Sequence, residues 1–512
     1  MFDPDTGTGP IDDTQVGSVR RDVVRGVFWT VGARWVFRGL GLITTIILAR
    51  LLMPRDFGLM AMATVVIGFL EVLFSQGIDT ALIQNASATR AHWDTAWTIR
   101  VIQGTAMAAL LLVLAPLAAR YYEEPAMTTI MPILAIGALA TSVENIGPVA
   151  FRKDLQFHRD FQFMVAKRLV LFVLVLCLAL VWRDYRALMI SIVLGAMAST
   201  GLSYALHPFR PKWSLAKAPE IWGFSFRLAA INLARYVNGN AEKLVIGAIA
   251  GAEKTGIYYV GDEIAEMPYT ELVGPSSRVT VPGFAKIKHV PARLKSAALK
   301  VLGFVALLSI PASAGLAVVS DNLVTVVLGP RWADAAAIIQ LCAVAGGFVA
   351  LHSIFVNLLV VVGRLNAIIC VAYVNVLLFG ILLFPAVRSY GILGAAVLKG
   401  ALAAASFAIY GWLASRAIRA SLLEIFAVLW RPLGSAIFMV YACLSIAGFF
   451  ASPSAALASQ ITVGAVCYGV ATFALWAASG CPEGAERDLL EIASDQARSL
   501  WASIAIRLKY HD

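Results

Sequence analysis

Two arginines four residues apart, Arg34 and Arg38, lie inside the first long apolar segment of the chain. A charge near the centre of a bilayer costs about 2.5 to 3.5 kcal/mol on insertion scales, so membrane helices rarely carry one without a function. The spacing places both guanidinium groups on one face of a helix, which Thr30, Gly41 and Thr45 extend into a polar stripe. Guanidinium groups bind phosphate oxygens with two parallel hydrogen bonds, so this pair is suited to a phosphate-bearing ligand.

Other cationic and amide residues stand in later apolar segments. Asn232 and Arg235 fall on one face of the segment 222–250, and this pattern suits sugar hydroxyls or phosphate. The alternative is that these groups only hold helices together. Arg278 and Lys399 complete the set of expected ligand-binding residues. Lys399 is either a further cation for the ligand or a lysine whose ammonium group reaches out of a helix end.

Three carboxylates, Glu71, Asp262 and Glu266, are the expected ion-coupling residues. Carboxylates at membrane depth are suited to proton or sodium coupling, because protonation removes the cost of inserting their charge. Glu266 is the best single candidate, since it lies nearest the middle of its segment. Two alternatives remain open: Glu71 forms a structural ion pair with Arg38, and the acids of the later segment neutralise arginines opposite them.

No catalytic residue, metal site or cofactor site is expected. The six cysteines are scattered through apolar segments without a CxxC pair, and the lone His352 is expected to be a packed polar residue. The chain has no Walker motif, no HExxH, no GxSxG and no EF-hand loop. The expected outer loops are short and leave no room for a catalytic domain. The sequence therefore argues against an enzyme.

The elements that must position these residues are membrane helices. The chain is 60% hydrophobic and 14% charged, against about 25% charged in soluble domains. Apolar runs long enough to cross hydrocarbon recur throughout, which predicts an all-α polytopic membrane protein. The runs give about fourteen spans, at roughly 24–51, 57–83, 95–119, 127–150, 161–182, 187–207, 222–250, 255–280, 299–319, 336–362, 366–387, 391–414, 432–450 and 459–479.

The basic residues predict the orientation of these spans. With the N-terminus inside, the inner segments and adjoining helix ends hold about 20 Lys and Arg, and the outer loops hold about 7. Residues such as Lys167 and Arg168, near the inner end of a span, belong to the inner group. The net charge of +10 is then a topological signal and an attraction to anionic lipid, and it does not indicate a nucleic-acid partner. Both termini are expected in the cytoplasm.

A weak internal repeat predicts two lobes. The segment Leu52–Leu59 resembles Ala250–Ile257 at an offset of 198 residues, and a second set of matches has an offset of 205. The expected parts are an N-terminal tail (1–23), a six-helix lobe (24–207), an inner linker (208–221), a second six-helix lobe (222–417), an extra helix pair (418–480) and a cytoplasmic tail (481–512). Within this last part, 485–508 reads as an amphipathic helix on the inner membrane surface.

Several stretches together resemble the Wzx-type bacterial polysaccharide flippases, which belong to the multidrug/oligosaccharidyl-lipid/polysaccharide exporter superfamily. They are Ile47–Met62 (ILARLLMPRDFGLMAM), Arg152–Phe157 (RKDLQF), Asn240–Gly247 (NAEKLVIG), Val281–Phe284 (VPGF) and Leu328–Trp332 (LGPRW). The similarity covers most of residues 20–420. One departure is Glu242, where the family pattern leads us to expect an aspartate.

The resemblance implies two six-helix lobes around a central cavity in the bacterial inner membrane. It also implies a cargo, an oligosaccharide on an undecaprenyl diphosphate carrier, which alternating access turns over for exopolysaccharide or lipopolysaccharide assembly. The diphosphate would rest on the arginines, the sugars would occupy the central cavity, and membrane lipid would hold the polyprenyl tail. A polysaccharide polymerase and glycosyltransferases are the protein partners to consider. Two alternatives are a cation-coupled multidrug exporter of the same superfamily and a non-transporting scaffold for polysaccharide assembly.

Overall fold

The computed structural model describes residues 32, 36–74, 77–85, 87–482 and 484–487, and every regular element within these ranges is a helix. Nine helices among them are long and apolar enough to cross a membrane. The expected all-α polytopic class is therefore confirmed, while the total of about fourteen spans stays a prediction. The chain divides into two compact units, Met1–Gly256 and Ile257–Asp512.

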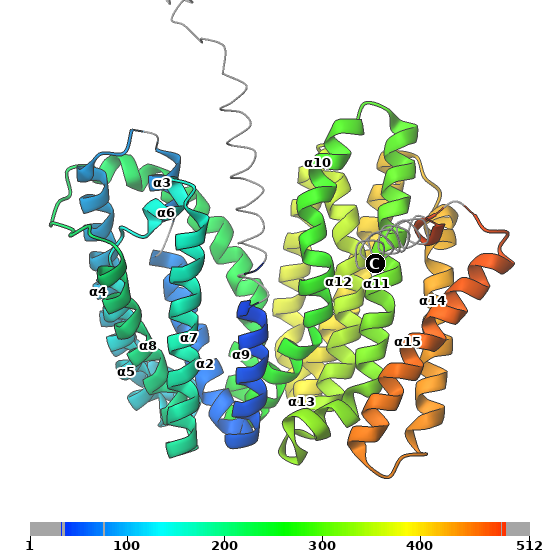
Figure 1. The fold of residues 1–512 in the computed structure, drawn as a ribbon, viewed down its shortest axis with the longest axis horizontal. Coiled ribbons are helices and arrows are strands. Elements are labelled where there is room, and N and C mark those ends of the chain that lie inside the picture. The colour runs from blue at the N-terminus through cyan, green and yellow to red at the C-terminus, as the bar shows by residue number, and fades with distance from the viewer. Residues whose placement is uncertain (1–31, 33–35, 75–76, 86, 483, 488–512) are drawn as a thin grey trace, which may run out of the picture. The chain divides into compact units, whose positions relative to one another are not determined.

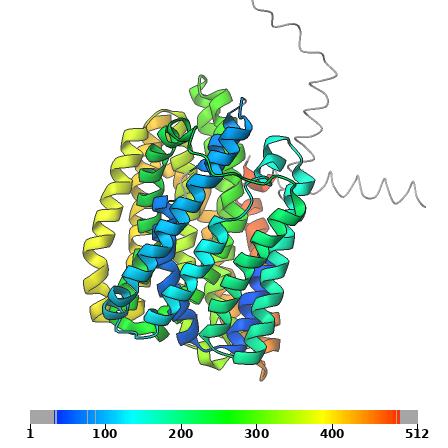
Figure 2. The same ribbon diagram turned by 90° about the vertical axis from the view of Figure 1, so that its left-hand side faces the viewer.

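The N-terminal unit consists of long helices that run alongside one another (Figures 1 and 2). Two short helices, α3 and α6, contact each other at one end of this bundle. After a helical stretch at 36–51 the elements are α2 (Pro54–Phe74), α3 (Ile78–Gln84), α4 (Arg90–Tyr121), α5 (Met127–Ser142), α6 (Val149–Lys153), α7 (Phe157–Trp182), α8 (Tyr185–Leu206) and most of α9 (Ala218–Ala265).

These helices have the length and the surface that a bilayer requires. The 26 residues of α7 give a helix of about 39 Å, enough to cross roughly 30 Å of hydrocarbon. Leu111 and Ile130 are fully buried between α4 and α5, where they join the apolar core of the unit. By contrast, Val113 is 69% exposed and Val181 is 73% exposed. Large aliphatic side chains at such positions are suited to contact with lipid.

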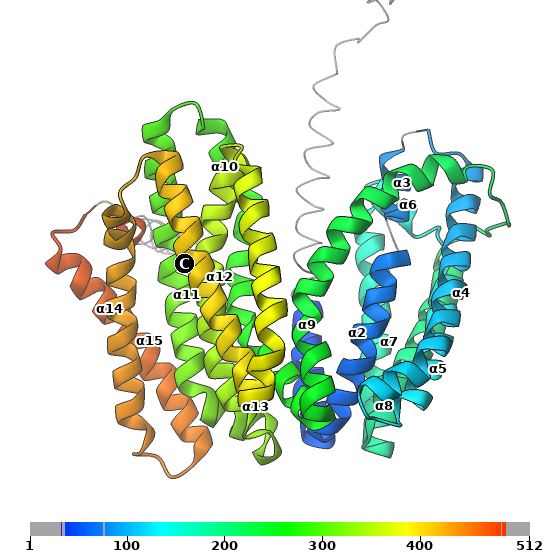
Figure 3. The same ribbon diagram turned by 180° about the vertical axis from the view of Figure 1, so that it is seen from behind.

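The C-terminal unit is a second helical bundle, with α14 and α15 packed against each other and against α11 (Figure 3). Its core includes Ala350, Ile354 and Leu358 of α12. The elements are η1 (Tyr269–Val273), η2 (Gly274–Ser276), α10 (Ser277–Ile287), α11 (Pro291–Leu323), η3 (Val324–Leu328), η4 (Pro330–Trp332), α12 (Ala335–Val361), α13 (Leu365–Ile418), α14 (Leu422–Ala447) and α15 (Pro453–Ala478).

Two of the helices contain a sharp break at a glycine. In α9 the break is at Gly251 (φ 78°), and in α13 it is at Gly391 (φ 61°). A positive φ is open to glycine but strained for other residues. Each glycine stands where the sequence predicts the junction between two spans. The helix α13 covers both of its expected spans, whereas α9 covers the span 222–250 and only the first part of the span 255–280.

The segment that follows α8 is bound to the N-terminal unit. The Asp94 carboxylate accepts a hydrogen bond from the backbone N–H of Lys212 (2.9 Å), and the Thr98 hydroxyl accepts one from Ser214 (3.0 Å). Both acceptors belong to α4. The compact units divide after Gly256, whereas the lobe boundary expected from the sequence is the linker 208–221, and that boundary stays a prediction.

Within the N-terminal unit, α2 and α9 approach so closely that only glycine fits at the contact. A Cβ added to Gly58 would lie 1.7 Å from the carbonyl oxygen of Ala252, and one added to Gly256 would lie 1.9 Å from the carbonyl oxygen of Pro54. Gly58 and Gly256, like Pro54 and Ala252, are 198 residues apart in the sequence. The contact therefore pairs equivalent positions of the two repeats reciprocally.

We expect Gly58→Ala to destabilise the protein by about 1–3 kcal/mol, because the added methyl group forces apart two helix backbones that are already in contact. The measurement is the thermal denaturation midpoint of the detergent-purified protein. Gly201→Ala is the matched control, because nothing lies within 4 Å of a Cβ placed there in α8. Equal midpoints for Gly58→Ala and the wild type would contradict this contact.

Candidate functional site

A cavity of about 1110 Å³ lies within the N-terminal unit, lined by the helical stretch 36–51 and by α2, α4, α5, α7 and α8. Its wall includes Gly104 of α4, Gly137 of α5 and Gly195 of α8. A Cβ added to Gly104 would lie 2.1 Å from the Cβ of Ser142, and one added to Gly195 would lie 2.9 Å from Leu171. These glycines therefore let the helices around the cavity pack closely.

The cavity wall carries ionisable groups of both signs in equal number. Four carboxylates and four cationic groups line it, so its formal charge is zero: Glu71, Asp79, Glu144, Asp160, Arg100, Arg152, Lys167 and Arg168. Isolated charges are costly among apolar helices. Three of the cationic groups are accordingly found in ion pairs with three of the carboxylates.

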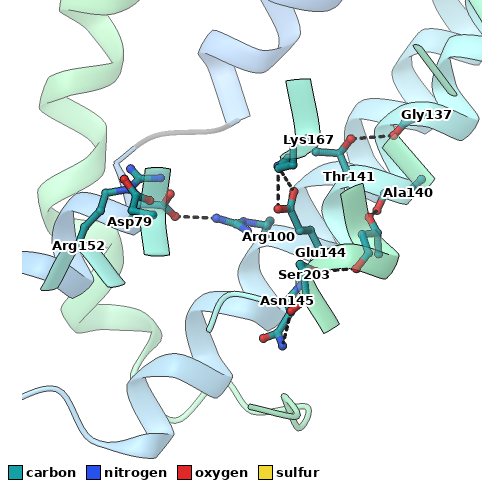
Figure 4. A network of polar contacts seen from close by, with 12 residues as sticks. Asp79, Arg100, Gly137, Ala140, Thr141, Glu144, Asn145, Arg152, Lys167 and Ser203 are labelled. Carbon is teal, nitrogen blue, oxygen red and sulfur yellow. Dashed lines mark hydrogen bonds and ion pairs between the residues drawn. The ribbon is translucent and has the colours of Figure 1, made fainter. Parts of the chain in front are cut away.

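The most buried of these carboxylates belongs to Glu144, which follows the C-terminal end of α5. Glu144 is 8% exposed, and the Lys167 ammonium on α7 donates hydrogen bonds to both of its oxygens, at 2.8 and 3.0 Å (Figure 4). The Lys167 side chain is 31% exposed, so the pair is only partly desolvated, but the Glu144 carboxylate would lose its charged partner if Lys167 were replaced. The pair therefore ties α7 to the end of α5 and neutralises both groups.

The other two pairs join short helices to long ones. Arg100 of α4 donates to Asp79 of α3 at 2.6 Å (Figure 4), and Arg152 of α6 donates to Asp160 of α7 at 3.1 Å. Charge-assisted hydrogen bonds of this kind are stronger than neutral ones. They place α3 and α6 at the cavity.

Three charged or amide residues of the lining keep their hydrogen-bonding capacity. No side-chain hydrogen bond or ion pair joins Glu71, Gln103 or Arg168 to another residue in the described ranges. Glu71 offers a carboxylate acceptor, Gln103 an amide donor and acceptor, and Arg168 a set of guanidinium donors. Polar groups of this kind are available to a ligand in the cavity.

Asn145 also lines the cavity. Its amide donates to the backbone carbonyls of Phe209 (2.8 Å) and His207 (3.3 Å), and its carbonyl oxygen accepts from Gly147 N–H (2.9 Å). Its own backbone N–H donates to the Ser203 hydroxyl at 2.9 Å (Figure 4). One buried amide thus connects the end of α5 to the end of α8 and to the segment after it.

The C-terminal unit holds a second charged cluster. The Lys399 ammonium on α13 donates to Asp262 at 2.7 Å and to Glu266 at 3.2 Å. Asp262 is 7% exposed, while the Glu266 side chain is half exposed. The two acids are one helical turn apart, so a single lysine reaches both. The sequence predicts Lys399 as a ligand-binding residue and the two acids as ion-coupling residues. In the structure the Lys399 ammonium is in direct contact with both acids.

The remaining residues expected at the site are described to different extents. Arg34 lies outside the described residues, as do the side chains of Asn232, Arg235 and Arg278. Arg38 lies in the helical stretch 36–51, and its neighbour Phe37 lines the cavity. Glu71 lines the same cavity. The expected C-terminal amphipathic helix falls almost wholly outside the described part of the chain.

Sequence reasoning missed most of the cavity's charged residues. Lys167 and Arg168 counted only as inner-side basic residues, because they lie near the inner end of a span, and Arg100 was not considered. A signal was present: each stands several residues inside an apolar run, beyond the point at which a charge marks the membrane boundary. Among the residues that the structure describes, no group of three or more His, Cys, Asp or Glu is placed to hold a metal.

Curated relatives of this chain are similar over most of their length. The chain is 27% identical to the teichuronic acid biosynthesis protein TuaB of Bacillus subtilis, over 78% of this chain and 84% of that protein. It is 26% identical to the lipopolysaccharide biosynthesis protein WzxC of Escherichia coli, over 64% and 68%. It is 24% identical to the succinoglycan biosynthesis transport protein ExoT of Rhizobium meliloti, over 94% and 96%.

Solved structures share the fold. The lipid II flippase MurJ, in an inward closed conformation, superposes with a TM-score of 0.71 at 11% identity, covering 91% of this chain and all of that one. An inward-facing multidrug resistance transporter of the MATE family superposes with a TM-score of 0.58 at 11% identity, covering 74% and 94%. Identity this low carries the fold and nothing further.

The family model described as polysaccharide biosynthesis protein matches residues 47–337, more than half of the chain. This match includes the stretches from Ile47 to Trp332 on which the sequence resemblance rests. That resemblance is confirmed, and the chain belongs to the polysaccharide biosynthesis protein family.

Proposed function

We propose that the protein is a flippase that turns undecaprenyl-diphosphate-linked oligosaccharide units from the cytoplasmic to the periplasmic face of the bacterial inner membrane. The activity is transport by alternating access, and it serves exopolysaccharide or lipopolysaccharide assembly. Family membership supports it, together with relatives named for polysaccharide biosynthesis and transport. The observation that carries the proposal is a large polar cavity within a bundle of apolar, membrane-length helices, because a hydrophilic cargo needs such a site to cross hydrocarbon.

The diphosphate of the cargo requires cationic groups. In this proposal Arg34, Arg38 and Arg235 supply them, because guanidinium groups bind phosphate oxygens in pairs of parallel hydrogen bonds. The cavity of the N-terminal unit, with equal numbers of acids and bases, is a poor match for that part of the cargo.

Two other functions make different predictions. A cation-coupled drug exporter needs a cavity with carboxylates, aromatic residues and little net positive charge, and the charge balance of the cavity in the N-terminal unit favours it as the second candidate. Against it stand the relatives, which are named for polysaccharides. A non-transporting scaffold would tolerate neutralisation of every intramembrane charge. Polymer export and drug susceptibility, measured together in cells that lack the gene, separate the drug exporter from the other two. Polymer export by variants with neutralised intramembrane charges separates the flippase from the scaffold.

We expect Arg38→Ala to abolish polymer export while the protein remains inserted in the membrane. Arg38→Lys should restore export only in part, because lysine keeps the charge but loses the two-pronged donor geometry. The measurement is polymer released by cells in which each variant replaces the chromosomal copy, normalised to protein in the membrane fraction.

Arg120→Ala is the matched control for this experiment, since Arg120 is an exposed residue at the outer end of α4. It should export normally. The role of the arginines would be refuted by a stably expressed Arg34→Ala, Arg38→Ala double variant that exports as much polymer as the wild type.

The energy source is a second part of the proposal. After the cargo leaves, the arginines proposed to hold its diphosphate lose their anionic partner, and the reset of the empty transporter is costly unless carboxylates offset their charge. Asp262 and Glu266 can exchange the Lys399 ammonium, which they hold in the structure, for a proton or a sodium ion. Glu71 is the corresponding acid of the N-terminal unit.

We expect flipping in proteoliposomes to depend on an imposed proton or sodium gradient, and Glu266→Gln to reduce that dependence because it removes an ionisable oxygen. The measurement is exposure of a lipid-linked oligosaccharide on the far leaflet, with and without the gradient. Glu253→Gln, at an exposed position of α9, is the control and should keep the wild-type response. A wild-type rate that no gradient changes would mean that cargo alone resets the transporter and that these acids are only counter-charges.

A further inference from the structure

The cavity of the N-terminal unit is large enough for part of an oligosaccharide. Its volume of about 1110 Å³ lies just above the range of pockets that bind drug-sized ligands, which is roughly 300–1000 Å³. Its wall combines aromatic residues such as Phe37 and Phe74 with hydroxyl, amide and charged groups. A sugar ring has the same two characters, apolar C–H faces and polar hydroxyl edges.

The charge of the cavity discriminates between ligands. The pairs Arg100–Asp79, Arg152–Asp160 and Lys167–Glu144 neutralise six of its eight ionisable groups. A diphosphate would meet four carboxylates there and gain little from the paired cations. A polyhydroxyl ligand without a large net charge meets no such repulsion, and charged side chains make strong hydrogen bonds to hydroxyl groups.

The charged and amide residues of the wall that are unpaired within the described ranges, Glu71, Gln103 and Arg168, are also suited to sugar hydroxyl groups. A hydroxyl group both donates and accepts, so it needs partners of both kinds. Glu71 accepts, Arg168 donates and Gln103 does both, from α2, α7 and α4 respectively. A ligand at these residues would be held from three directions.

We propose that this cavity is a sugar subsite, in which Glu71, Gln103 and Arg168 bind hydroxyl groups of the oligosaccharide and select which repeat unit is accepted. This inference rests on the proposed flippase function. Two sites would then recognise the cargo. The arginines bind the diphosphate that every cargo has, and the cavity inside the N-terminal unit binds the sugar, which differs between cargoes. An analogue that lacks one of these hydroxyl groups makes one hydrogen bond fewer to a charged or amide side chain, so it binds more weakly.

The test measures binding of two lipids to the full-length protein in nanodiscs. One is undecaprenyl diphosphate, and the other is the same carrier bearing the oligosaccharide, isolated from cells that make this protein. We expect the wild type to bind the glycosylated carrier more tightly. Gln103→Leu should weaken that binding about tenfold and leave binding of the bare carrier within twofold of the wild type. Arg38→Ala should weaken both.

Gln162→Leu is the matched control, because Gln162 is an exposed residue of α7 that does not line the cavity. It should bind both lipids like the wild type. Glu71→Gln, which keeps the size of the side chain, supplies a second variant if Gln103→Leu fails to fold. Equal affinities of the wild type for the two lipids, or equal effects of Gln103→Leu on both, would overturn the sugar subsite alone. Binding of neither lipid by the wild type would overturn the flippase function and the subsite with it.

Discussion

The cost of placing an ionised group among apolar helices governs how this protein is built. A charge in that environment is retained only if an opposite charge or strong hydrogen bonds offset its lost hydration. Lys167 and Glu144 meet this requirement in the N-terminal unit, and Lys399 and Asp262 meet it in the C-terminal unit. The same requirement makes each ion pair a structural link between two helices, because separating the pair would leave a charge without a partner among apolar side chains.

Ion pairing also shapes what the cavity of the N-terminal unit can bind. Carboxylates that neutralise cations remove the positive field that a diphosphate needs, but they leave many polar atoms along the wall. The result is a surface that offers hydrogen bonds without a net charge. A cargo with a charged end and a sugar end poses two recognition problems, and separate sites allow each to be solved by the appropriate chemistry. The proposed sugar subsite follows from this division.

Glycine has the opposite role to the charged residues, because it allows backbones to approach. Gly58 and Gly256 bring α2 and α9 into direct backbone contact, and the equivalent positions of these two residues in the sequence repeat give the contact its reciprocal form. Gly251 and Gly391 let single continuous elements change direction at positive φ. Helices that are otherwise uniformly apolar thus obtain their specific geometry from a few residues without side chains.

The sequence by itself determined the class of the protein, because the length of an apolar run and the sparseness of charge are local properties. These two properties decide whether a helix is stable across a bilayer. It also determined the family, since each of the short stretches between Ile47 and Trp332 is a continuous run of residues that can be recognised without the structure. Only the tertiary structure decided which charges meet. Lys167 and Glu144 are 23 residues apart and lie on different helices, and their contact depends on the rotation and depth of each helix against its neighbours. Packing of the whole bundle sets those two quantities, so no local pattern encodes the cavity that they create.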